Sequence, residues 1–159
     1  SKAYMNDGGA KGKELAAKYV AAVEKFDAAY AKFNETLNKV NAEQSKKQIE
    51  KLKKDGKKGY AAAMESTLRL TELVDKLEKA PQNADKAAVE KELSEIEALL
   101  KSINNDRGQV LADRYNSVVG DVRQVLADPS DSNLNNMIEG FNGYIDTYNS
   151  TTPDQFDAK

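Results

Sequence analysis

Apolar residues repeat along the first third of the chain at the spacing of a coiled-coil helix. The repeating positions are Tyr19, Val23, Phe26, Tyr30, Phe33, Leu37 and Val40. Their intervals alternate between four and three residues, which places every member on one face of a helix. Lysines at every seventh residue from Lys11 to Lys53 form a second stripe, at a solvent-facing heptad position. The pattern therefore predicts a long amphipathic helix over about 10–42.

The heptad pattern stops after Val40, because its next two positions hold the polar residues Gln44 and Lys47. Ser45–Gln48 then matches a capping box, in which a Ser and a Gln side chain bond free amides at a helix start. We therefore expect a second helix over about 45–79. Glycine lowers helix stability by about 1 kcal/mol relative to alanine, so a break at Gly56–Gly59 is the alternative.

Three further apolar stripes follow, separated by residues typical of turns. They predict helices over about 85–103, 107–127 and 131–149, and one continuous helix across 85–127 stays open as an alternative to the break at Asn104–Gly108. No segment alternates between apolar and polar residues as a strand does, so the fold class is all-α. Short connections favour antiparallel neighbours, and the prediction is an elongated up-and-down helical bundle.

The composition sets limits on the chemistry. The 159 residues, expected to form a single all-helical domain over 1–159, contain no Cys, His or Trp. Thiol nucleophiles, histidine-dependent triads and zinc sites with Cys or His ligands are therefore excluded. An enzyme would have to use carboxylates alone, such as those between Glu90 and Glu97. We expect no catalytic activity, cofactor or metal.

Charge points to one candidate surface. The net charge is -2, which gives no general attraction to nucleic acid. The stretch 46–58 nevertheless has a net charge of +5, and clustered lysines can bind anionic lipid headgroups. Its members are Lys46, Lys47, Lys51, Lys53, Lys54, Lys57 and Lys58. The competing interpretation is a solvated helix face near a chain reversal.

Aromatic residues followed by asparagine form a second candidate surface. The pairs in the predicted fourth and fifth helices are Tyr115–Asn116, Phe141–Asn142 and Tyr148–Asn149. Aromatic faces and amides could bind a sugar or another small amphipathic ligand in a cleft between helices. The competing interpretation places the aromatic rings in the core, with the asparagines beside them.

Two stretches resemble a known family. Tyr4–Leu15, with its Ala-Lys-Gly-Lys-x-Leu element, and Ala21–Asp27 are similar to the YiiG-like bacterial lipoproteins, a domain family of unknown function. The closing segment Phe141–Asn149 resembles the last helix of that family, so the likeness covers mainly residues 4–40 and the end of the chain. Ala16–Ala17 stands where the family often has His-Pro. The resemblance implies a lipid anchor and further helical sequence upstream.

These observations lead to one functional expectation. We expect a non-enzymatic helical module of the bacterial cell envelope, on the periplasmic side, that acts through protein contacts or as a spacer. Its partner would be an envelope protein and not a nucleic acid. Membrane contact would come only through the missing lipid anchor or weakly through the lysines of 46–58. The alternative is a helical bundle that binds a small ligand or glycan. The sequence leaves the oligomeric state open.

Overall fold

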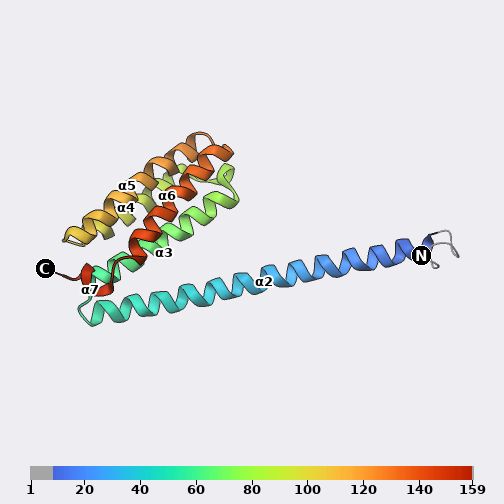
Figure 1. Cartoon of the computed structure of the whole chain (residues 1–159), viewed down its shortest axis with the longest axis horizontal. Helices are drawn as coiled ribbons and strands as arrows, with labels where there is room; N and C mark the ends of the chain where they lie inside the picture. The colour runs from blue at the N-terminus through green and yellow to red at the C-terminus, as the bar shows by residue number, and fades with distance from the viewer. Residues whose placement is uncertain (1–8, 159) are drawn as a thin grey trace. The chain divides into compact units, whose positions relative to one another are not determined.

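The computed structural model describes residues 9–158, apart from the side chain of Glu35. Its elements are α2 (Ala10–Lys54), α3 (Lys58–Lys79), the short 3-10 helix η1 (Pro81–Asn83), α4 (Lys86–Lys101), α5 (Asp106–Ala127), α6 (Asp131–Asn149) and α7 (Pro153–Phe156) (Figure 1). No strand occurs in this part of the chain, so the all-α prediction is confirmed. The first part of the Tyr4–Leu15 stretch, through residue 8, lies outside the described residues.

The chain divides into two units, residues 1–44 and residues 45–159. α2 spans the boundary and contributes its last ten residues, 45–54, to the second unit. The second unit contains all the remaining helices. The expectation that 1–159 acts as a single domain stays a prediction.

The first predicted helix break is wrong. α2 runs without interruption through 41–45, and Ser45 lies inside it and does not cap a new helix. This segment contains neither Gly nor Pro, so the change of apolar face alone does not stop the helix. The helix ends instead at Lys54, and the alternative break at Gly56–Gly59 is confirmed. Gly56 follows in the turn with a φ of 79°, which suits glycine. Amides of Gly56 and Lys57 bond carbonyls of the last turn, at 3.3 Å and 2.9 Å, in a Schellman motif.

The predicted break between the third and fourth helices is correct, with slightly different ends. α4 stops at Lys101, and α5 begins after Asn105, whose side chain accepts a hydrogen bond of 3.0 Å from the amide of Gly108. Asp85 caps α4 in the same way, at 2.9 Å from the amide of Ala87. These caps satisfy amides that a helix start leaves without a partner.

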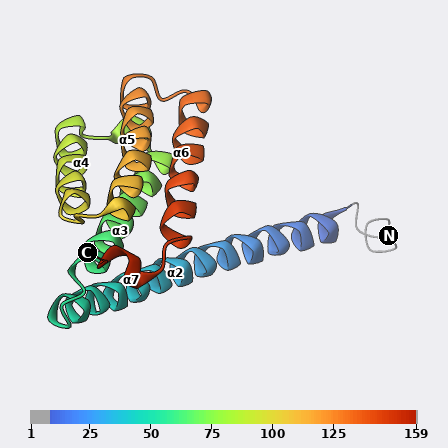
Figure 2. The ribbon, with the colours of Figure 1, turned by 60° about the vertical axis from the view of Figure 1, so that its left-hand side comes forward.

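The four helices α3 to α6 form an antiparallel bundle in the second unit. α4 packs on α3 and α5, α6 packs on α5, and contacts between α3 and α6 close the arrangement (Figure 2). Each helix turns its apolar stripe inward, as the heptad spacing predicts. The bundle buries residues from every helix, including Leu70 in α3, Ile96 in α4, Val122 in α5 and Met137 in α6.

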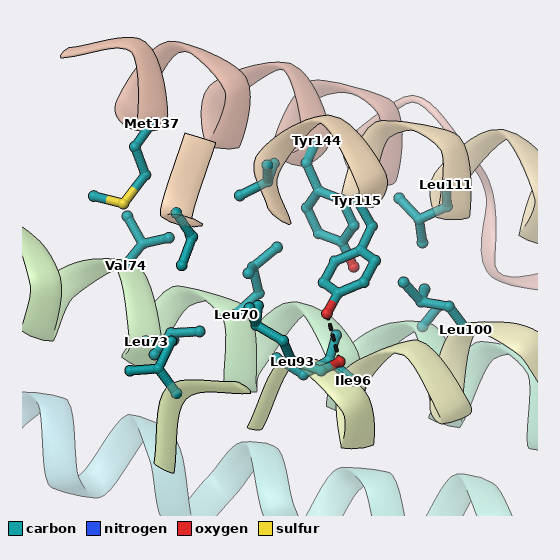
Figure 3. Packing of buried hydrophobic residues seen from close by; sticks show 14 of the residues in the cluster. Leu70, Leu73, Val74, Leu93, Ile96, Leu100, Leu111, Tyr115, Met137 and Tyr144 are labelled. Atoms are coloured by element: carbon teal, nitrogen blue, oxygen red, sulfur yellow. Dashed lines mark hydrogen bonds between the residues drawn. The ribbon is translucent and has the colours of Figure 1, made fainter. Parts of the chain in front are cut away.

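Two tyrosines bring hydroxyl groups into this core (Figure 3). The Tyr115 hydroxyl donates to the carbonyl of Leu93 at 2.5 Å. The Tyr144 hydroxyl lies 3.1 Å from the hydroxyls of both Ser66 and Thr67. Burial raises the pKa of Tyr144 above its usual range. Both phenols are therefore neutral core groups whose polar ends are hydrogen-bonded.

Residues 153–157, which we name the C-terminal latch, close one end of the bundle. Phe156 is buried, and its ring stacks on Tyr60 and Tyr148 with centroid separations of 6.2 Å and 6.1 Å. Asp157 accepts hydrogen bonds from the amides of Gly59 at 2.7 Å and Tyr60 at 3.3 Å. A carboxylate thus caps the start of α3 from 98 residues further along the chain.

A charged cluster ties α3 to α4 on the outside of the bundle. The Arg69 guanidinium binds Glu92 through two hydrogen bonds of 2.7 Å and 2.9 Å, and it also contacts Glu95. These bonds hold the pKa of Glu92 below its usual range. A bidentate contact on a partly exposed surface stabilises by about 1 kcal/mol.

The acid dependence of this contact is a first testable prediction. Because the pKa of Glu92 is lowered on folding, its contribution to stability is present at neutral pH and lost as pH falls from about 4 through the lowered value. We expect Glu92→Gln to reduce the free energy of unfolding by about 1 kcal/mol at pH 7 and by less at pH 3. Urea titrations at both pH values measure this. Glu78→Gln, on an exposed position of α3, is the control, and an equal loss for Glu92→Gln at both pH values would refute the ion-pair origin.

Candidate interaction surface on α2

The heptad residues identified in the sequence form a continuous exposed stripe on α2. We name this set the seam: Tyr19, Val23, Phe26, Tyr30, Phe33, Leu37 and Val40. Its side chains are between 39% and 72% exposed, and Leu15 and Val20 beside them are exposed too. α2 is the only helix among residues 9–44, so the first unit by itself has nothing that covers the seam.

The surroundings of the seam keep it apolar. The rings of Phe26 and Tyr30 stack on the helix surface, with centroids 6.2 Å apart and planes at 8°. The heptad positions on either side carry mainly small or uncharged residues, such as Ala22, Ala29 and Asn34. The lysine stripe stands at another heptad position, away from the seam. The result is a helix face rich in aromatic rings, with little charge along its edges.

The area of the seam marks it as more than scattered surface residues. A Tyr or Phe side chain covers about 150–250 Å², so four rings roughly two-thirds exposed present about 500 Å². The aliphatic members bring the total to about 800 Å². Contiguous apolar patches of this size on soluble proteins usually mark sites of interaction. Heptad spacing in the sequence locates these residues but does not mark them as a binding site, because a heptad stripe usually belongs to a core.

The seven lysines of the candidate anionic-surface site lie along the end of α2, the turn after it and the start of α3. Lys53 lies 2.9 Å from Glu65 and 3.5 Å from Glu50, and the contact with Glu65 raises the pKa of Lys53. Lys57 lies 3.0 Å from Asp154 of the latch. Within residues 9–158 the other five form no ion pair with a carboxylate, and all are exposed: Lys46, Lys47, Lys51, Lys54 and Lys58. Two of the seven therefore form ion pairs with carboxylates of the folded chain, and binding of an anionic surface by the rest stays a prediction.

The aromatic–asparagine residues do not gather around one cleft. Tyr115 is buried, and Phe141 and Tyr148 are partly buried against the core. Their neighbours in sequence point outward, and all three are exposed: Asn116, Asn142 and Asn149. The hollow beside Tyr115 and Asn116 has a volume of about 110 Å³, below the ~300 Å³ of a typical ligand pocket. The geometry favours core packing for the rings.

A larger hollow lies elsewhere among the described residues. It is an open groove of about 590 Å³ between α3 and α4, with Leu73, Leu77 and Val89 among its lining residues. None of the six aromatic–asparagine residues lines it. Its rim carries charged side chains of both signs, including Asp75 and Lys76.

The acidic residues of α4 are engaged in ion pairs. Glu90 binds Arg123 at 2.9 Å, and Glu97 lies 2.6 Å from Lys101, while Glu92 and Glu95 contact Arg69. The Arg123 contact lowers the pKa of Glu90. No group of three potential metal ligands occurs within residues 9–158. In the same range, none of the helices has an apolar stretch long enough to cross a bilayer.

Comparison with known proteins adds one finding. The profile of a family described as a protein of unknown function, DUF3829, matches residues 1–110. The chain belongs to this family. The match spans the seam, the lysine stretch and the helices through α4. It supports the inference of an uncharacterised domain family, whereas the YiiG-like name rests on resemblance alone. No curated protein and no solved structure matches the chain.

Proposed function

We propose that this chain is a non-catalytic helical module that acts through protein contacts made by the seam of α2. The observation that carries the proposal is the exposure of seven apolar heptad residues on a helix whose own unit offers them no cover. Exposing about 800 Å² of apolar surface costs free energy that a protein partner would recover. The α3–α6 bundle serves as the folded body that carries this helix.

The proposal places the module in the bacterial cell envelope, on the periplasmic side, tethered by lipid in its precursor. The support is the resemblance of Ala10–Leu15 and the segments around it to bacterial lipoproteins. The absence of Cys among the 159 residues suits an oxidising compartment, where a stray thiol would form unwanted disulfides. A protein partner in the same compartment follows from this placement.

Photo-crosslinking in bacterial cells tests the proposal. The precursor is produced with benzoylphenylalanine at Phe33 in the seam or, as the control, at Ala28 on the opposite side of α2. We expect irradiation to give a discrete protein adduct in the membrane fraction at position 33 and none at position 28, because only the seam meets a partner. Mass spectrometry of the adduct identifies the partner and its compartment. Absence of any adduct from Phe33 and a second seam position, Phe26, would contradict the proposed function.

A further inference from the structure

The strict heptad spacing of the seam restricts what can cover it. Its apolar residues recur at alternating intervals of four and three, an average of 3.5 residues. Side chains with this spacing fit into the holes between side chains of a partner helix that has the same repeat. The other apolar stripes of the chain are already used. Those of α3, α4 and α5 are buried in the bundle core, as Leu70, Leu93 and Val118 illustrate. Within residues 9–158, the heptad stripe that is left unburied is the seam. A second copy of the chain would therefore supply a partner helix with the same repeat.

The edges of the seam suit a second copy. In a coiled coil, the two heptad positions beside the apolar residues often carry charges that select the partner. Here they hold few charges, Asp27 and Glu43 being the acidic ones between residues 19 and 43. Two identical helices therefore bring few like charges together, the two Asp27 carboxylates of an antiparallel pair being the exception. The alanines at 22 and 29 also allow the helix backbones to approach closely.

The sizes of the seam residues favour an antiparallel pair. If two copies run in opposite directions about residue 28, Tyr19 faces Leu37, Val23 faces Phe33, and Phe26 faces Tyr30 of the other copy. Two of these three layers join a ring to a smaller side chain. A parallel pair in register would instead place Phe26 against Phe26 and Val23 against Val23. Alternating large and small side chains across an interface fill space better, and antiparallel helix dipoles attract each other.

The available area is sufficient for a stable pair. About 800 Å² of apolar surface on each copy corresponds to about 1,600 Å² in total, the size of a standard specific interface. We infer that two copies of this chain associate through their seams as an antiparallel coiled coil of α2 helices. This inference rests on the proposed function, because it names the partner of the same surface.

Light scattering coupled to size-exclusion chromatography tests the association on the full chain. We expect a mass of twice 17.5 kDa that falls towards 17.5 kDa on dilution. Phe26→Glu buries a charge in the centre of the interface and should raise the dimer dissociation constant about 100-fold or more. Ala28→Glu introduces the same side chain two residues away on the exposed opposite face and should leave the dissociation constant within about 3-fold of the unmodified chain.

The outcomes separate this inference from the proposed function. A monomer at every concentration, or a dimer that Phe26→Glu does not weaken, overturns the second copy as the occupant. If the chain is monomeric while Phe33 still crosslinks to a different protein in cells, only the occupant is wrong and the proposed function stands. If Phe33 forms no adduct in cells and the chain is monomeric, both are wrong. Crosslinking of Phe33 to a second copy of the chain supports both the proposed function and this inference.

Orientation is measured with a spin label, which the absence of native cysteine makes site-specific. Ala17→Cys carries the label on an exposed side of α2. In the antiparallel pair the two labels are separated by 22 residues along the axis, or about 33 Å at 1.5 Å per residue. In a parallel pair they would be separated mainly by the distance between helix axes, about 10 Å. Electron–electron distances near the shorter value would overturn the antiparallel arrangement.

Discussion

Phe156→Ala is expected to lower the free energy of unfolding of the bundle by about 3 kcal/mol, although it lies three residues before the last residue of the sequence. The side chain is buried and stacks on Tyr60 and Tyr148. Its removal deletes both ring contacts and leaves a cavity at the end of the bundle. It also loosens the segment that holds Asp157 at the start of α3. Thermal unfolding followed by circular dichroism should show a midpoint lower by about 10 °C.

Asp154→Ala is the matched control within the latch. Its carboxylate lies 3.0 Å from Lys57 Nζ, but its side chain is highly exposed, so the ion pair contributes little. The expected loss is therefore no larger than that of an ordinary surface substitution and far below that of Phe156→Ala. Similar effects for the two substitutions, or a loss below about 1 kcal/mol for Phe156→Ala, would show that the latch does not stabilise the bundle.

The latch shows where prediction from the sequence ends. The pattern of apolar residues placed the last helix at 131–149, which agrees with α6. Phe156 follows Pro153 as a single aromatic residue with no periodic neighbours, so no pattern marks it as core. Its partner Tyr60 and the amides capped by Asp157 lie nearly 100 residues earlier. Contacts at such a distance in sequence depend on how the helices pack, which local periodicity does not specify.

The helix boundaries follow the same rule. Breaks marked by strong local chemistry, such as Asn104–Gly108 and Asp128–Asp131, were predicted within a few residues. The break placed near Ser45 was wrong, because it relied on a change of apolar face. That change occurs where α2 passes into the second unit, in which Ile49 is buried. A change in what a helix packs against can therefore imitate a helix end.

The residues of the candidate site could be predicted from the sequence, but their exposure could not. Heptad spacing identified every residue of the seam, but spacing is the same for a stripe inside a bundle and for one that waits for a partner. Val23 in the seam and Val89 in α4 occupy equivalent stripes, yet the first is 39% exposed and the second 7%. Only the three-dimensional arrangement distinguishes a core stripe from an interaction surface.

Gly108→Ala and Gly120→Ala make the same change on α5 and should have opposite effects. A Cβ at 108 would lie 2.3 Å from the carbonyl oxygen of Ile103 and 2.6 Å from two carbons of its side chain. The backbone carbonyl cannot move aside cheaply, so we expect a loss of about 2–3 kcal/mol. A Cβ at 120 meets nothing within 4 Å, on an exposed helix position. There, alanine should increase the free energy of unfolding by about 0.5–1 kcal/mol.

Urea titration of both variants measures the two values, and the sign of the difference is decisive. The start of α5 requires glycine at 108 because Asn105 caps the helix by accepting from that amide at 3.0 Å while Ile103 packs over it. If Gly108→Ala is neutral or stabilising, the connection from α4 to α5 does not have this close approach. Stabilisation by Gly120→Ala together with destabilisation by Gly108→Ala would show why position 108 requires glycine. The reason would be the close approach of the turn between α4 and α5, and not helix propensity alone. The α4–α5 connection would then be held by backbone proximity as well as by its cap.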